Sequence, residues 1–134
     1  MIPSAVLLAS LLGIMLNLAE AGLLLQPDWS AGILVAAILA HRSNWVWALP
    51  GIWMHDLALH WSSFVCLPLA VLLPWLMMRI DEQIGPALPQ RMALMLLTLS
   101  PLLWFDWGIS QWLLTNLVCI AVWYMMTHYY AEPV

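Results

Sequence analysis

The 134-residue chain is 65% hydrophobic and 7% charged, against roughly 25% charged residues in an ordinary soluble domain. It has 3 basic residues, all arginine, and 7 acidic ones, which give a net charge of −4. Ten charged side chains are too few to make the surface of a globule of this size hydrophilic. The composition therefore excludes a soluble, secreted or disordered protein. The lack of a basic cluster excludes nucleic-acid binding.

The N-terminal apolar stretch is expected to be retained as a first membrane span. Residues 1–25 are too long for a signal peptide and lack both a basic start and a small-residue cleavage site. The two cysteines, Cys66 and Cys119, lie inside apolar runs, so we expect apolar packing rather than a disulfide or a metal site.

Six apolar segments follow one another, separated by short polar breaks. They cover residues 2–25, 30–40, 45–59, 64–78, 92–105 and 109–127, and residues 79–91 form the one long polar loop. The pattern predicts an all-α integral membrane protein, a single transmembrane domain over residues 1–134 built as a compact bundle of about six short helices.

The arginines choose between this count and one in which the second and third segments form a single span. Fusing them places Arg42 near the middle of the bilayer, at a cost of about 2.5–3.5 kcal/mol. With six spans, Arg42, Arg79 and Arg91 share one face, whereas Asp28 and Asp106 share the other. The positive-inside rule then puts both termini in the cytoplasm. A hairpin of residues 30–40 and 45–59 that does not cross fully stays open.

Prolines inside the fourth and fifth segments predict kinked helices. Pro68 and Pro74 lie in the fourth segment and Pro101 in the fifth. Each proline removes a backbone donor, so a carbonyl is left that needs another partner, such as Ser100 or Thr98 near Pro101.

Four ionisable residues, Glu20, His55, Asp56 and His60, lie in or near the membrane segments. Asp56 and His60 are four residues apart on one helix face and are expected to be able to pair. Ionisable groups inside a membrane are functional candidates by default. Because Glu20 and Asp56 both map close to the outer surface, we expect them to reach the interface and be hydrated there.

No catalytic, cofactor or metal motif is present. The sequence lacks the HExxH, GxSxG and SxxK patterns, so we expect no enzyme. The middle of the bundle offers only four polar residues, Asn17, Ser100, Thr115 and Asn116. A small-molecule carrier remains an alternative, with Asn17, Glu20 and Asp56 lining a cavity. An accessory subunit of a respiratory or photosynthetic complex is another.

The second to fourth segments carry a family resemblance. Pro27-Asp28-Trp29, the short apolar run 33–40, the basic His41-Arg42 turn and the stretch 49–57 that ends near Asp56 resemble the bacterial rod shape-determining protein MreD family. Residues 64–79 are similar to its fourth span and basic end. The resemblance is specific over about residues 22–79.

The resemblance implies a multi-pass scaffold subunit of the bacterial inner membrane, within the cell-elongation machinery that builds peptidoglycan. It implies binding to MreC, a single-span protein, and through MreC to MreB and the peptidoglycan synthases; it implies no cofactor. A homodimer stays open. Asp28 is expected to cap the second helix, Gly51 to admit a close neighbour, and Asp56 to fix helix contacts or partner docking. The full set of expected structural or partner-binding residues is Pro27, Asp28, Trp29, Gly51, Asp56, His60 and Glu20.

Overall fold

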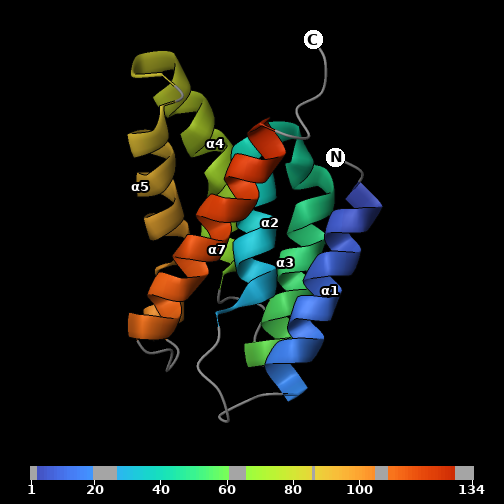
Figure 1. Ribbon diagram of the computed structural model, residues 1–134. Coiled ribbons are helices and arrows are strands. Elements are labelled where there is room, and N and C mark those ends of the chain that lie inside the picture. Colours follow the sequence, from blue (N-terminus) through green and yellow to red (C-terminus); the bar gives the residue numbers. More distant parts are fainter. Residues whose placement is uncertain (1–2, 20–26, 61–65, 86, 105–108, 129–134) are drawn as a thin grey trace.

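The computed structural model describes residues 3–19, 27–60, 66–85, 87–104 and 109–128 (Figure 1). Every regular element in these ranges is helical, so the all-α prediction is confirmed. The elements are α1 (Pro3–Ala19), α2 (Trp29–Ala40), the 3-10 turn η1 (Arg42–Asn44), α3 (Trp45–His60), α4 (Leu67–Gln83), α5 (Leu88–Leu99), the short α6 (Pro101–Trp104) and α7 (Ile109–His128). The predicted segments correspond to α1, α2, α3, α4, the pair α5 and α6, and α7.

Helix α2 occupies the centre of the bundle. It contacts α1, α3, α4, α5 and α7, and α7 crosses in front of it in Figure 1. Six consecutive residues, from Leu34 to Leu39, are at most 1% exposed. A helix that is apolar on every side is buried on every side, and this explains why its sequence shows no polar face.

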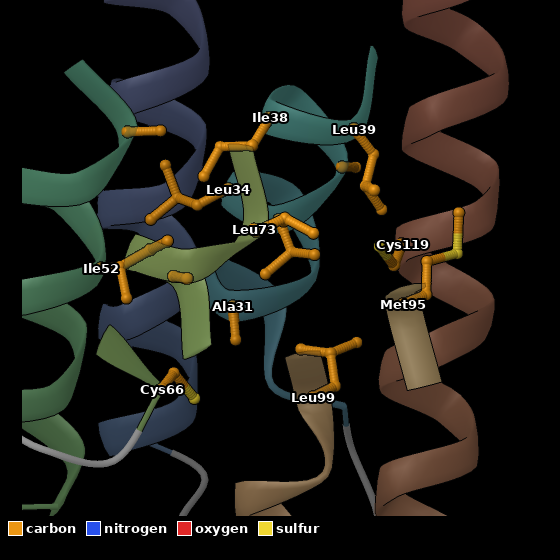
Figure 2. Close-up of a cluster of buried hydrophobic side chains, with 14 of the residues drawn as sticks. Ala31, Leu34, Ile38, Leu39, Ile52, Cys66, Leu73, Met95, Leu99 and Cys119 are labelled. Carbon is orange, nitrogen blue, oxygen red and sulfur yellow. The ribbon is translucent and has the colours of Figure 1, made fainter. Parts of the chain in front are cut away.

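The hydrophobic core lies around α2 and takes side chains from four of its neighbours (Figure 2). Leu34, Ile38 and Leu39 of α2 pack with apolar side chains of α3, α4, α5 and α7, among them Ile52, Leu73, Met95, Leu99 and Cys119. Cys66 and Cys119 are buried in this core, so the apolar packing predicted for them is confirmed.

Three glycines let helices approach closely. A Cβ atom on Gly13 of α1 would lie 2.5 Å from the Cβ of Trp29, and one on Gly32 would lie 3.2 Å from the backbone oxygen of Thr115 in α7. A Cβ on Gly51 of α3 would lie 3.1 Å from Leu34 Cδ1, so the close neighbour expected at Gly51 is confirmed.

Successive helices run in opposite directions, so each end of the bundle gathers a different set of helix ends and their charged residues. α1 begins, α2 ends, α4 ends, α5 begins and α7 ends at the upper end in Figure 1. Arg42 of η1, Arg79 of α4 and Arg91 of α5 belong to this end, called the basic end below. The expected grouping of the three arginines is therefore found in the fold.

The polar loop predicted over residues 79–91 is shorter than expected, because a helix extends into it from each side. α4 continues to Gln83, and α5 begins at Leu88. Arg91 Nη1 and Nη2 donate to the two carboxylate oxygens of Asp81 at 2.9 and 3.0 Å. This bidentate pair joins the two helix ends across a turn at Gly85, whose φ is 115°. Polar residues that looked like a loop therefore extend both helices.

The prolines have different effects in α4 and at the end of α5. Pro68 lies in the first turn of α4. Backbone N–H groups in a first turn have no partner within the helix, so a proline there breaks no hydrogen bond and the kink predicted at Pro68 is wrong. Pro74 lies inside α4. At Pro101 the freed carbonyl is that of Leu97, and it accepts a hydrogen bond from Ser100 Oγ at 2.6 Å, as predicted.

Large apolar side chains are exposed on every helix that surrounds α2. Examples are Leu12 of α1, Trp53 of α3, Leu72 of α4, Leu97 of α5 and Leu117 of α7, all at least 48% exposed. Among the described helices, α7, with 20 residues, is long and apolar enough to cross a membrane on length and composition alone. The 12 residues of α2 span about 18 Å at 1.5 Å per residue.

Candidate functional site

Asp28 begins the buried polar cluster at the end of the bundle opposite the basic end. It is the N-cap of α2, and its Oδ1 accepts from the backbone N–H of Ala31 at 3.3 Å, as predicted. Its Oδ2 lies within hydrogen-bond distance of His55 Nε2. The side chain is fully buried. The carboxylate therefore ends one helix and reaches another.

His55 of α3 joins two carboxylates. Its Nε2 faces Asp28, and its Nδ1 lies 2.8 Å from Asp56 Oδ1. All three side chains are 0% exposed. Because both ring nitrogens face carboxylate oxygens, the arrangement fits an imidazolium that donates to both acids. Residues 27 positions apart in the chain thus meet in one ion cluster.

Asp56 holds the beginning of α4. Its Oδ2 accepts from the backbone N–H groups of Cys66 and Leu67, both at 3.0 Å. These are among the orphan donors at a helix N-terminus, where the helix dipole favours a negative charge. Since the N-cap residue Cys66 makes no side-chain capping bond itself, the cap for α4 is supplied by α3.

The turn at residues 27–29 is also held by α1 and α7. Asn17 Nδ2 donates to the Pro27 carbonyl at 2.8 Å, and its Oδ1 accepts from the backbone N–H of Trp29 at 3.3 Å. The backbone N–H of Asp28 donates to Thr115 Oγ1 at 2.9 Å. The single amide of Asn17 therefore satisfies a donor and an acceptor of the turn.

These contacts connect five helices at one place. We call Asn17, Asp28, His55, Asp56 and Thr115 the polar cluster. It lies at the end of α1, the beginning of α2, the later part of α3, the beginning of α4 and the first half of α7. Buried polar groups are stable only when hydrogen-bonded, so each member fixes the position of the others.

Some expectations for these residues are wrong. Asp56 was expected to be hydrated at the interface, but it is fully buried and contacts the neighbouring His55. The interface position was inferred from one segment alone, whereas the site is made by packing several helices. The expected pairing of Asp56 with His60 stays a prediction. Glu20 and the side chain of His60 lie outside the described residues.

Sequence reasoning treated the remaining polar residues singly. Thr115 was noted only as a single polar residue, Asn17 was otherwise placed only in the cavity of the carrier alternative, and His55 was not connected to Asp28. One signal was available: each lies inside an apolar segment, where a polar side chain needs a buried partner. The partners themselves could not be read, because they come from distant segments.

An open cleft of about 830 Å³ lies at the basic end, away from the polar cluster. Among its lining residues are Trp45 of α3, Trp75 and Asp81 of α4, and Arg91 of α5. The guanidinium of Arg79 lies 5.6 Å from the centre of a Trp75 ring. Asn17 and Asp56, which the carrier alternative places at a cavity, do not line this cleft.

Comparison with known proteins gives no family assignment: no protein-family model matches the chain, and no curated protein or solved structure is significantly similar to it.

Proposed function

We propose that this chain is a non-enzymatic scaffold of the bacterial inner membrane, which crosses it six times and acts in the cell-elongation machinery. The membrane location rests on the inversion of an ordinary soluble surface, and the role in cell elongation rests on the resemblance of residues 22–79 to the MreD family. Large apolar side chains face outward around the bundle, while the polar cluster is enclosed within it. Such a surface is costly in water and suits lipid.

The short central helix fits the same proposal. α2 is too short to span a hydrocarbon core of about 30 Å, but its surroundings are protein rather than lipid. A short or interrupted segment is tolerated at membrane depth where protein covers it. Its N-terminal donors are met by Asp28, and Asn17 and Thr115 bind the turn before it.

The basic end gives the proposed orientation. Arg79 and Arg91 lie there, together with the turn that contains Arg42. Under the positive-inside rule this end faces the cytoplasm, along with the beginning of α1 and the end of α7. The polar cluster then lies toward the outer side of the membrane.

A scaffold role is supported by the way the cluster uses its polar atoms. Asp28, His55 and Asp56 are fully buried, and each bonds other parts of the chain. A catalytic group has to reach its substrate, whereas these groups face helix ends. The resemblance suggests two roles for Asp56, fixing helix contacts or docking a partner. The burial of its carboxylate favours the first, because a buried group cannot contact a docking partner.

The proposed partner is an MreC-like single-span protein, and through it MreB and the peptidoglycan synthases. Since Asp28 and Asp56 are internal, a partner helix would pack on an outward apolar face instead. α1 offers a broad one, with Leu8, Leu12 and Met15 each more than half exposed. In a membrane, helices associate through such packing contacts rather than through a hydrophobic drive.

The test is capture of the partner from native membranes. A tagged full-length chain, cross-linked in cells and solubilised in detergent, is expected to co-purify with an MreC-like single-span protein. Depletion of the chain is expected to make rod-shaped cells lose their shape. Retention of normal shape after depletion, with no MreC-like protein in the purified material, would remove the proposal.

A further inference from the structure

We propose that His55, Asp56 and Cys66 bind one divalent transition-metal ion of the zinc type. The ion would connect α3 with the beginning of α4, next to Asp28. The three side chains offer a nitrogen, an oxygen and a sulfur ligand, and all three residues are buried. Each of these chemical types is a usual zinc ligand.

The distances fit a small ion. One ligand atom from each residue can be chosen so that all three lie within 4.8 Å of one another. With metal–ligand bonds of about 2.0–2.3 Å, ligands around a tetrahedral zinc lie roughly 3.3–3.8 Å apart. To reach this geometry the longest ligand–ligand distance would shorten by at most about 1–1.5 Å, and the His55 Nδ1–Asp56 Oδ1 distance of 2.8 Å would lengthen by about 0.5 Å.

Asp28 gives the site the outer support that metal-bound histidines usually have. Its carboxylate lies against His55 Nε2, while Nδ1 points toward Asp56, so an ion held by these two residues would replace the 2.8 Å contact between Nδ1 and Asp56 Oδ1. A carboxylate behind a ligating imidazole fixes the ring orientation and makes the ring a better ligand. Asp28 is itself fixed as the N-cap of α2, so the support is rigid.

The charges also fit. Two carboxylates and an imidazolium carry one net negative charge. Two carboxylates, a neutral imidazole, the Cys66 thiolate and a divalent cation carry the same charge. The buried site can thus take the ion without acquiring a new uncompensated charge, which would be costly there.

The mixture of ligands selects the class of ion. Calcium and magnesium prefer sites made of oxygen ligands. A thiolate beside an imidazole and a carboxylate favours zinc or cobalt over those ions. Cobalt is a useful probe because a thiolate–cobalt bond absorbs light in a region where the unloaded protein does not.

The experiment uses the full-length chain purified in detergent, stripped with a chelator and then loaded with Zn²⁺ or Co²⁺. We expect about one ion per chain by elemental analysis and a thiolate-to-cobalt absorption band in the Co²⁺ form. Cys66→Ala is expected to lose the band, while Cys119→Ala, which removes the other buried cysteine, keeps it. Asp28→Asn is expected to weaken Co²⁺ binding by about 10–100-fold.

Two results would overturn the metal site. One is equal metal uptake by the wild type and Cys66→Ala, and the other is no uptake by the wild type at all. If Cys66→Ala does not fold, X-ray absorption at the zinc edge of the loaded wild type replaces it. One sulfur neighbour is then expected, and a shell of nitrogen and oxygen alone contradicts the assignment.

Discussion

Replacing His55 by alanine is expected to lower the free energy of unfolding of the purified chain by about 3–5 kcal/mol. The substitution leaves the Asp28 and Asp56 carboxylates buried near each other without the cation between them. Removing one partner of a buried ion pair is costly because the remaining charge stays out of water. Denaturant unfolding in detergent, with a chelator present to remove metal, measures the effect.

Two further variants make this result specific. His41→Ala, at an exposed histidine of the basic end, is expected to change stability by less than about 0.5 kcal/mol. Asp28→Asn should destabilise the wild type but stabilise the His55→Ala chain, because it then removes a charge that has lost its partner. Two results would contradict the ion cluster. One is a loss of stability in His55→Ala no larger than that in His41→Ala, and the other is additive effects of the substitutions at residues 28 and 55.

Gly13→Leu is expected to cost at least about 1–3 kcal/mol by overpacking. The new Cβ would lie 2.5 Å from the Cβ of Trp29. Both atoms are attached directly to the backbone, so no side-chain rotation relieves the clash and α1 must move away from the beginning of α2. That movement also pulls Asn17 from the turn it binds, at Pro27 and Trp29.

The matched control lies on the same helix. Ala9 is exposed, so Ala9→Leu adds the same side chain to the outward face of α1. It is expected to leave the unfolding midpoint within about 0.5 kcal/mol of the wild type. Equal effects of the two leucines would show that α1 does not pack closely at Gly13.

Local rules predicted much of the fold. The alternation of apolar runs and polar breaks indicated the helices in their order, and Asp28 was recognised as a cap because it directly precedes an apolar run. Both features depend on residues close together in the sequence. Gly51 was also expected to admit a close neighbour, but that neighbour, Leu34, lies 17 positions away on α2 and could not be named in advance.

The polar cluster could not be predicted in this way. Asp28 and His55 are 27 residues apart, and Asp28 and Thr115 are 87 apart. Their contacts depend on how α2, α3 and α7 pack, and periodicity carries no information on that. The contact between Asp56 and the adjacent His55 was not foreseen either. At residues 79–91, charge was mistaken for a loop because the Asp81–Arg91 pair was not foreseen.

The most direct test of the proposed membrane bundle is the side from which each of its ends can be labelled. Ser43→Cys and Gln83→Cys introduce exposed thiols at the basic end, and Ser110→Cys introduces one at the opposite end, where α7 begins. The native Cys66 and Cys119 are buried and serve as internal negative controls.

An impermeant maleimide is added to intact spheroplasts and to inverted vesicles. The account predicts that position 110 reacts only in spheroplasts and positions 43 and 83 only in inverted vesicles. Reaction of positions 43 and 83 from opposite sides, or of positions 43 and 110 from the same side, would contradict the six-span bundle.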